Sequence, residues 1–420
     1  MPSSASPRTS GVLPRQAIRA AIDAGWIRSG ARIEDRHVQP ASLDLTLGAR
    51  AYRLRSSFLP GRKSVAEQLD TFLMDEIDLR DGAVLEQGRP YLVELNEELA
   101  LPPGLKARAN PRSSTGRLDI FTRLLTDRGE RFDEVREGYA GRLYVEVVSR
   151  SFTVRVRTGL RLNQLRFIAG EAPVSDQELV AWHGREPLVF ASSTVGSHER
   201  APVSGGLFLS VDLSRQAKLQ YVGYRARRNS ALIDLEQTGK YEIRDFWERV
   251  AADRHGKLIL EPEEFYLLVS RERVRVPPGL AAEMAAYDPT SGELRTHYAG
   301  FFDPGFGVVA DGELPGTAAV LEVRAHDVSF ALEHGQTLCK LTFEYMQEAP
   351  DKLYGADLGS RYQRQYLALG RQFRAGSIGE MRGSAGRRPD SPLTLDLVSA
   401  EADSLPMELR PGFVEPVEPR

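Results

Sequence analysis

The stretch "PYLVELNEELALPPGL" (residues 90–105) recurs as "FYLLVSRERVRVPPGL" (residues 265–280), at a constant offset of 175 residues. Further along, "FTVRVRTGLRLNQLRF" (152–167) corresponds to "VSFALEHGQTLCKLTF" (328–343) at an offset of 176 residues. Solenoid repeats have much shorter units and need at least three copies to bury a core. The repeat therefore predicts two tandem copies of one domain.

Each copy is predicted to be mainly β. Apolar and polar residues alternate in "GRLYVEVV", "FTVRVR", "AAVLEVR" and "VSFALE", and PPG, TG and HG turns separate these runs. One helix is predicted in "LPRQAIRAAIDAGWI", which has Pro14 near its start and Gly25 as a stop signal. A second candidate helix is "RDFWERVAADRHG" (244–256).

The composition is that of a soluble globular protein, with 41% hydrophobic residues and a net charge of -3. This balance argues against binding of nucleic-acid polymers, which requires a basic excess. No apolar run is long enough to span a bilayer, and "MPSSASPRTSG" lacks a signal-peptide core, so we expect a cytoplasmic protein without membrane contacts. The single cysteine, Cys339, excludes intrachain disulfides and multi-cysteine zinc sites, and its alternating context favours a core position.

One loop differs in charge between the two copies. "RSSTGR" (112–117) offers two guanidiniums, three hydroxyls and a glycine, a set suited to a polyphosphate. The alternative is an ordinary turn with solvated arginines. In the second copy, "YDPTSGEL" (287–294) has Asp288, Pro289 and Glu293 at the positions of Arg112, Ser113 and Arg117, and its acidic charge should repel phosphate. We therefore predict that only the first copy binds the anion.

Four stretches together resemble the motifs of deoxycytidine triphosphate (dCTP) deaminases, which are relatives of the trimeric dUTPases: "QPASLDLTLG", "LPPGLKARANPRSSTGRL", "HYAGFFDPGFG" and "AVLEVRAHD". The resemblance covers most of residues 11 to 375. It implies a dUTPase-like distorted jelly roll (β-clip) in each copy, with sites at contacts between units. The expected division is a first domain at 11–175, a linker at 176–205, a second domain at 206–350, a C-terminal clamp at 351–375 and a weakly ordered tail at 376–420.

The resemblance also implies roles for individual residues. The nucleoside loop is Asp303 to Gly307, and the first copy has Arg136 at the position of Asp303. These complementary losses predict one composite site, with the phosphate loop of copy one and the nucleoside pocket of copy two. Whether it closes within one chain or in a homo-oligomer stays open. The implied substrate-binding residues are Arg112, Ser113, Ser114, Thr115, Gly116 and Arg117 in the phosphate loop, Asp303, Val320 and Leu321 in the pocket, and Tyr354, Arg361 and Gln365 in the clamp.

Deamination of cytosine adds water at C4 and expels ammonia. Zinc deaminases use a His/Cys/Cys metal site, which one cysteine cannot supply, so a carboxylate is the expected general base and acid. The resemblance assigns this role to Glu322 in "AAVLEVR"; Glu146 in "LYVEVV" is the second candidate. The alternative for Glu322 is a solvated glutamate paired with Arg324. Mg²⁺ is expected with the triphosphate, and dTTP is a possible inhibitor.

His297 and Tyr298 precede the catalytic strand and are candidates to orient the base or ribose, although a structural histidine is the commoner outcome. Two competing functions remain. A dUTPase, or a bifunctional deaminase and dUTPase, needs an aspartate with a tyrosine three residues later. In this sequence the third residue after Asp303 is a phenylalanine, Phe306. A non-catalytic nucleotide-binding module is the other possibility.

Overall fold

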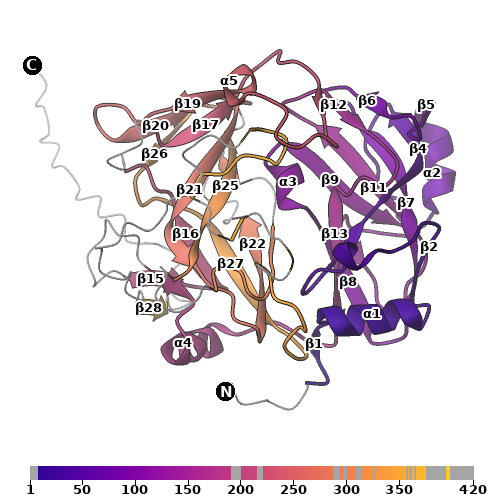
Figure 1. Ribbon diagram of the computed structural model, residues 1–420, viewed down its shortest axis with the longest axis horizontal. Coiled ribbons are helices and arrows are strands. Elements are labelled where there is room, and N and C mark those ends of the chain that lie inside the picture. The colour runs from indigo at the N-terminus through magenta and orange to yellow at the C-terminus, as the bar shows by residue number, and fades with distance from the viewer. Residues whose placement is uncertain are drawn as a thin grey trace, which may run out of the picture.

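The structure, a computed structural model, describes residues 8–190, 200–214, 221–286, 294–296, 300–308, 315–325, 327–355, 358, 362–363, 366–374 and 394–397. Two β units lie side by side, the first in indigo to magenta and the second mostly in salmon to orange (Figure 1). Among the described residues, no helix is long and apolar enough to cross a membrane.

The two units repeat the same sheet. In the first unit the strand order is β5-β4-β7-β11-β9 with β2 paired to β7, and in the second it is β19-β17-β21-β25-β23 with β14 paired to β21. The strands of the first sheet are β2 (Ile27–Ser29), β4 (Leu47–Leu54), β5 (Leu73–Asp78), β7 (Tyr91–Ala100), β9 (Ile120–Thr126) and β11 (Ala140–Ser149). Those of the second are β14 (Val189–Phe190), β17 (Gly223–Ala226), β19 (Trp247–Val250), β21 (Phe265–Val274), β23 (Leu294–Thr296) and β25 (Thr317–Ala325). This correspondence confirms the predicted duplicated, mainly β fold.

A second sheet in each unit is also repeated. Its order is β1-β13-β8-β10 with β3 paired to β13 in the first unit, and β24-β22-β27-β16-β15-β28 in the second. The first of these sheets contains β1 (Gly11–Val12), β3 (Leu43–Leu45), β8 (Leu105–Pro111), β10 (Glu134–Val135) and β13 (Asn163–Ala169). The other contains β15 (Arg200–Val203), β16 (Leu207–Ser210), β22 (Leu280–Ala286), β24 (Phe301–Phe302), β27 (Thr337–Tyr345) and β28 (Thr394–Leu397). The strand β28 falls in the segment predicted to be a weakly ordered tail.

Each unit also has a small sheet, and that of the first unit connects it to the second. The strands β6 (Ala83–Leu85) and β12 (Val154–Val156) pair in the first unit, as β20 (Lys257–Leu260) and β26 (Phe330–Glu333) do in the second. A strand of the second unit, β18 (Ile233–Asp234), adds to β12 in parallel. Apolar packing follows the same path, since the ring of Phe152 lies edge-on to Trp247 at 5.4 Å between centroids. The two units therefore share buried surface.

The predicted first helix is confirmed as α1 (Arg15–Asp23), which buries Ile18 and Ala21 and ends just before Gly25. The second candidate helix is wrong: only α5 (Ile243–Phe246) is helical, and β19 begins at Trp247. The reason is tertiary, because Phe246 and Trp247 are both buried and β19 pairs with β17. These tertiary contacts override the local helical spacing of the apolar residues.

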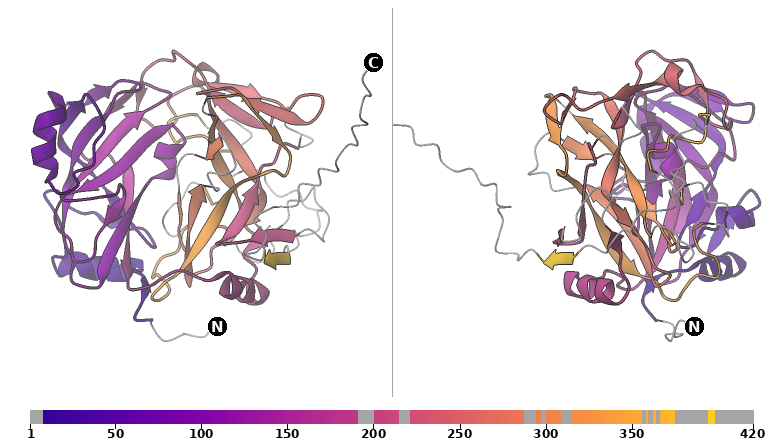
Figure 2. Two further views of the ribbon diagram at one scale, coloured as in Figure 1. Left: turned by 180° about the vertical axis from the view of Figure 1, so that it is seen from behind. Right: turned by 60° about the vertical axis from the view of Figure 1, so that its left-hand side comes forward.

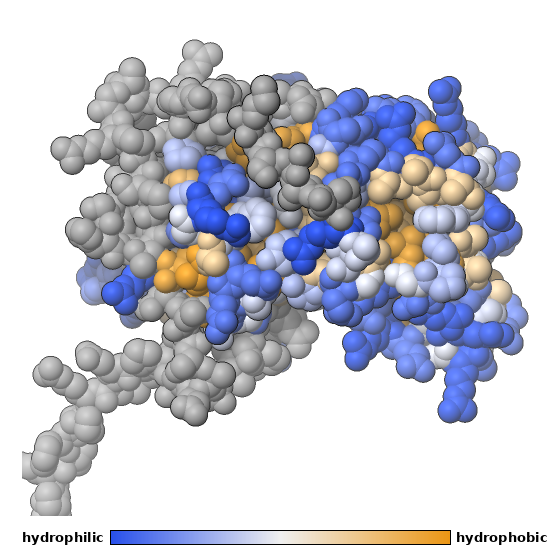
Figure 3. Space-filling model, turned by 90° about the horizontal axis from the view of Figure 1, so that it is seen from below, coloured by the Kyte–Doolittle hydropathy of each residue, from blue (hydrophilic) through white to orange (hydrophobic). Residues whose placement is uncertain are grey.

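The other helices are short and lie at the edges of the units. They are α2 (Val65–Phe72), α3 (Ser113–Gly116), α4 (Asp176–Arg185) and a 3₁₀ turn at Asp35–His37. The helix α2 lies at the outer end of the first unit, and α4 lies in the segment predicted to be a linker (Figures 1 and 2). Hydrophilic residues cover most of the described surface on the face seen from below, interrupted by smaller apolar areas (Figure 3).

Candidate active site

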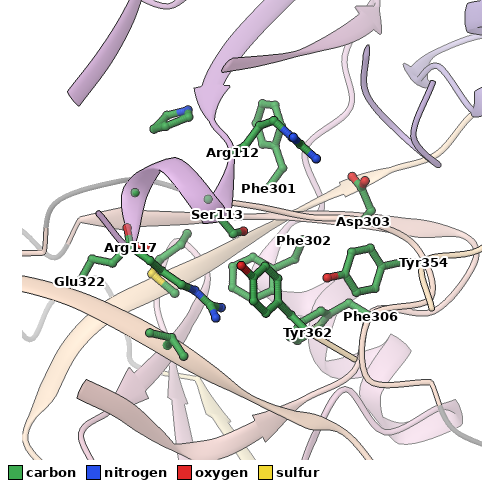
Figure 4. A pocket seen from close by; sticks show the side chains of 15 residues that line it. Arg112, Ser113, Arg117, Phe301, Phe302, Asp303, Phe306, Glu322, Tyr354 and Tyr362 are labelled. Carbon is green, nitrogen blue, oxygen red and sulfur yellow. The ribbon is translucent and has the colours of Figure 1, made fainter. Parts of the chain in front are cut away.

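A pocket lies between the two units of this chain, and both contribute to its wall (Figure 4). The composite arrangement expected from the sequence thus closes within one chain. The first unit supplies Pro111, Arg112, Ser113, Gly116 and Arg117; the second supplies Met284, Gly300, Phe301, Phe302, Asp303, Phe306, Val320, Glu322, Tyr354 and Tyr362.

The phosphate-loop candidates form a single helical turn at the end of β8. Arg112 precedes this turn in an extended conformation, and its Nε lies 2.9 Å from Oδ1 of the buried Asp44. Oδ2 of Asp44 lies 2.9 Å from Nη1 of Arg161, so one carboxylate holds two guanidiniums. Ser113 lines the pocket, whereas Ser114 is half-buried outside the lining set and Thr115 is fully buried.

Arg117 closes the other end of the loop. It is 3% exposed, its guanidinium lies 3.8 Å from the ring centroid of Tyr362, and its Nη1 donates to the carbonyl of Ala368 at 2.9 Å. A guanidinium over a tyrosine face is a favourable cation–π contact. The C-terminal segment therefore lies directly against the phosphate loop.

Glu322 projects from β25, a strand whose nine residues are all buried. A Cβ atom at Gly116 would lie 2.5 Å from Oε2 of Glu322, so the loop backbone touches this carboxylate. Burial raises the pKa of Glu322 well above its ordinary value; the nearby Arg117 opposes this effect, and the negative charge of Asp119 adds to it. Arg324 does not pair with Glu322. It pairs with Asp119 and Glu263 instead, so the solvated-pair alternative is wrong.

Asp303 directly follows β24, and an arginine of the first unit binds its side chain. Nη2 of the fully buried Arg166 lies 3.4 Å from Oδ1 of Asp303, and the Arg166 guanidinium lies 3.9 Å from the ring centroid of Phe301. Burial raises the pKa of Asp303 to about 6, against the opposing effect of Arg166. Gly307 has φ 68°, and a side chain there would collide with the carbonyl of Val274.

Aromatic rings form the opposite wall. The rings of Phe302 and Phe306 lie edge-on at 4.9 Å between centroids, and Tyr354 lies 5.7 Å from Phe306. Val320 lines the pocket next to Glu322, whereas Leu321 points from the opposite face of β25 into the core of the second unit. Such rings offer an apolar surface suited to a flat heterocycle.

The C-terminal clamp is docked on the nucleoside loop. The amide of Tyr354 donates to the carbonyl of Pro304 at 2.8 Å. The side chain of Gln363 donates to the carbonyls of Gly305 at 2.9 Å and Val308 at 2.6 Å. The predicted clamp residues Arg361 and Gln365 lie outside the described residues, as do His297, Tyr298 and the acidic positions Asp288 and Glu293.

In the first unit, the equivalent glutamate is in a different environment. Glu146 is 1% exposed and forms an ion pair with Arg123, whose Nε donates to Oε1 at 2.9 Å. Arg123 also lies 4.1 Å from the ring centroid of Phe132. Arg136, at the position of Asp303, is exposed. In the first unit, the charge of the equivalent carboxylate, that of Glu146, is thus neutralised by Arg123. In the second unit, the carboxylate of Glu322 faces a pocket.

Sequence reasoning missed several residues of this site. Phe301 and Phe302 adjoin the recognised Asp-Pro-Gly motif, so extending that motif by two residues would have found them. Tyr362 directly follows the predicted clamp residue Arg361, so the clamp motif itself was the signal that could have found it. Arg166 gave no signal, because its partner Asp303 is 137 residues away in sequence. Among the described residues, no three His, Cys, Asp or Glu side chains are grouped to hold a metal ion.

The comparisons with known proteins agree with this architecture. The family model of the 2'-deoxycytidine 5'-triphosphate deaminase N-terminal domain matches residues 9–171, and that of the C-terminal domain matches residues 175–373. A crystal structure of 2'-deoxycytidine 5'-triphosphate deaminase from Agrobacterium tumefaciens is 48% identical, with a TM-score of 0.78, over 84% of this chain and 100% of that chain. The chain belongs to the dCTP deaminase family, in a duplicated form.

Curated relatives are more distant. The dCTP deaminase of Haloarcula marismortui is 34% identical over 129 residues, which are 30% of this chain and 60% of that protein. The "dCTP deaminase, dUMP-forming" of Streptomyces coelicolor is 26% identical over 155 residues, 37% of this chain and 78% of that protein. The match to the Haloarcula protein thus spans less than two thirds of its length.

Proposed function

We propose that this chain deaminates dCTP to dUTP and ammonia in the pocket between its two units. The observation that carries the proposal is the contact between Glu322 of the second unit and Gly116 of the phosphate loop of the first. A carboxylate with a raised pKa next to a cationic, glycine-containing loop suits proton transfer on an anionic substrate. Membership of the dCTP deaminase family supports the choice of substrate.

The residues divide into three roles. Arg112, Ser113 and Arg117 would bind the triphosphate with charge-assisted hydrogen bonds. Asp303 would accept from the deoxyribose hydroxyl, and the rings of Phe302 and Phe306 would pack against the nucleoside. Mg²⁺ would accompany the triphosphate, held largely by phosphate oxygens and water.

Glu322 would move the protons. Its carboxylate takes a proton from a water molecule, and the resulting hydroxide adds to C4 of the cytosine ring. The protonated carboxyl then returns the proton to the amino nitrogen, the C4–N bond breaks, and ammonia leaves. The proton of the new C4 hydroxyl passes to N3, which gives the C4 carbonyl and the N3–H of the uracil ring. The balance is dCTP plus water to dUTP plus ammonia, and no metal is needed for the proton transfers. The buried setting suits this dual role, because a raised pKa makes the carboxylate a stronger base than an ordinary glutamate.

A second candidate activity is hydrolysis of dUTP to dUMP, because several relatives are named dUMP-forming. Phe306 argues against a tyrosine-dependent dUTPase, since no tyrosine lies three residues after Asp303. We propose further that dUTP made here enters dTTP synthesis in the cytoplasm, and that dTTP competes for the pocket.

The test is to incubate the purified protein with dCTP and Mg²⁺ and to resolve ammonia, dUTP, dUMP and pyrophosphate over time. We expect ammonia and dUTP in equal amounts. Ammonia with dUMP and pyrophosphate would establish the bifunctional enzyme. Binding of dCTP without ammonia would establish a non-catalytic module and overturn the proposal. A parallel incubation without Mg²⁺ and with a chelator tests the metal independence of the chemistry.

A further inference from the structure

A buried ion pair joins the two units beside Glu322. Asp119 is the second residue after Arg117 and is fully buried, and its carboxylate binds the guanidinium of Arg324. Arg324 lies two residues after Glu322 on the same strand and is 3% exposed. Ser151 donates to Oδ2 of Asp119 at 2.5 Å, and its Oγ lies 3.3 Å from Nη2 of Arg324. The pair thus ties the end of the phosphate loop to the strand that carries the glutamate.

The repeat contains this pair only once. At the offset of 176 residues, Arg295 stands at the position of Asp119, and Val148 stands at the position of Arg324. The phosphate loop also occurs only in the first copy, and the glutamate that faces the pocket, Glu322, only in the second. The ion pair joins these two features. It occurs where the loop of the first unit meets the strand of the second. An ion pair that served only the folding of a single unit would be expected in both copies of the repeat.

The geometry also explains why Arg324 does not neutralise Glu322. Residues two apart on a strand project from the same face, so the guanidinium of Arg324 could otherwise turn toward Glu322. Instead Arg324 donates to the backbone carbonyl of Glu263, pairs with the Glu263 side chain and binds Asp119. In the first unit, by contrast, Arg123 binds Glu146 directly.

We infer that Asp119 is a positioning residue for the deamination reaction: it holds Arg324 away from Glu322 and fixes the phosphate loop on the catalytic strand. This inference rests on the proposed function of Glu322. The charged groups that act on Glu322 are Arg117 from the loop and Asp119 after it; Arg324 itself faces Asp119, Ser151 and Glu263. Asp119 and Arg324 together are neutral, so removing one leaves a net charge next to Glu322.

The test compares ammonia release from dCTP, across pH, by the wild-type protein and D119N. Without the Asp119 charge, Arg324 can approach Glu322 and lower its pKa. We expect the acid limb of the pH profile of kcat to move to lower pH. We also expect kcat to fall about tenfold, because a weaker base transfers protons more slowly. KM should stay within about threefold, since the triphosphate contacts remain. A merely structural role would move the melting temperature and leave the pH profile in place.

Two further variants control this experiment. D119N/R324M removes both charges and should return the acid limb to the wild-type position. S151A removes a hydroxyl and keeps both charges, so its limb should not move. If D119N does not fold, R324M alone removes the guanidinium and keeps the carboxylate of Asp119. Its acid limb should then move to higher pH, because the negative charge of Asp119 disfavours the charged form of Glu322.

The outcomes separate the two proposals. A wild-type protein that releases no ammonia, or an E322Q variant with the wild-type rate, overturns the proposed function and this inference with it. An active wild-type protein whose D119N variant keeps its acid limb overturns the inference alone. The inference alone is also overturned if the acid limb of D119N/R324M lies at the same shifted pH as that of D119N, because Arg324 would then not cause the shift.

Discussion

Glu322 and Glu146 occupy equivalent positions of the repeat, and their surroundings differ in charge. Glu146 forms an ion pair with Arg123, whereas Glu322 faces the pocket against Gly116 with its pKa raised by burial. The guanidinium of Arg123 already occupies the carboxylate of Glu146, whereas the carboxylate of Glu322 lines the pocket. At the residue scale, this difference supports the proposal that Glu322, and not Glu146, transfers the protons.

We predict that E322Q lowers the rate of ammonia release by about 10²–10⁴-fold, the loss typical of removing general acid–base catalysis. Glutamine keeps the shape of the side chain but cannot accept the proton from water. Binding of dCTP should persist, because the phosphate loop and clamp are unchanged; isothermal titration calorimetry measures this. The matched variant E146Q should leave kcat within about twofold. An inactive E146Q together with a fully active E322Q would place the reaction in the first unit.

Gly116 allows the phosphate loop of the first unit to approach Glu322 of the second unit closely. A Cβ atom there would lie 2.5 Å from Oε2 of Glu322. We predict that G116A displaces the carboxylate and lowers kcat/KM for dCTP by about 10²-fold, since a misplacement of about 1 Å has this cost in active sites. G184A is the control, because no atom lies within 4 Å of a Cβ at that position. Equal activity of G116A and the wild-type protein would show that this contact is not used in catalysis.

At the scale of single elements, each unit contains the same buried glutamate on its long central strand. Glu97 on β7 accepts hydrogen bonds from the amide and hydroxyl of Thr46, and Glu272 on β21 accepts the same pair of bonds from Ser210. Burial raises the pKa of Glu97 from 4.5 to about 7, despite the hydrogen bonds that oppose this. The two strands thus carry a duplicated titratable group in the core.

This group should make stability depend on pH. The unfolded chain releases the proton of Glu97 near pH 4.5, whereas the folded chain holds it to about pH 7. The folded state therefore binds more protons between these values, and the free energy of unfolding falls as pH rises through this window. We predict a smaller fall for E97Q, measured by urea unfolding at pH 4.5, 6 and 7.5. The exposed neighbour provides the control, E98Q, whose slope should match that of the wild-type protein.

The elements that could be predicted from sequence are those whose pattern is local or repeated. The strands β11 and β25 follow from the alternation in "GRLYVEVV" and "AAVLEVR". The helix α1 follows from its spacing and from the flanking Pro14 and Gly25. The candidate helix at 244–256 was wrong because Trp247 packs against Phe152, 95 residues earlier, and that contact overrides local spacing.

The same limit applied to the site. The loop at 112–117 and Glu322 could be predicted because each lies in a recognisable motif. The ion pair of Arg166 with Asp303 and that of Arg324 with Asp119 could not, because 137 and 205 residues separate the partners. These contacts exist only when the two units have docked, so no local pattern encodes them.

At the scale of the whole molecule, the C-terminal segment joins both units after the last strand of the repeat. Tyr362 lies over Arg117 of the first unit, and Phe373 packs edge-on against Phe246 and Trp247 of the second at 5.6 and 6.0 Å. The amides of Gly239 and Lys240 donate to the carbonyls of Arg371 and Gln372 at 2.9 Å. The clamp is therefore anchored beyond the pocket, and its two ends have separable functions.

We predict that the two ends respond differently to mutation. Y362A removes the contact over Arg117 and should raise KM for dCTP by about tenfold, the equivalent of a cation–π contact of about 1 kcal/mol or more, with little change in melting temperature. F373A empties a buried aromatic position and should cost about 3–5 kcal/mol of stability, which scanning calorimetry detects as a lower melting temperature. Truncation before Tyr354 should combine the two effects. A truncated protein with the wild-type KM and melting temperature would show that residues 354–374 neither close the pocket nor hold the units together.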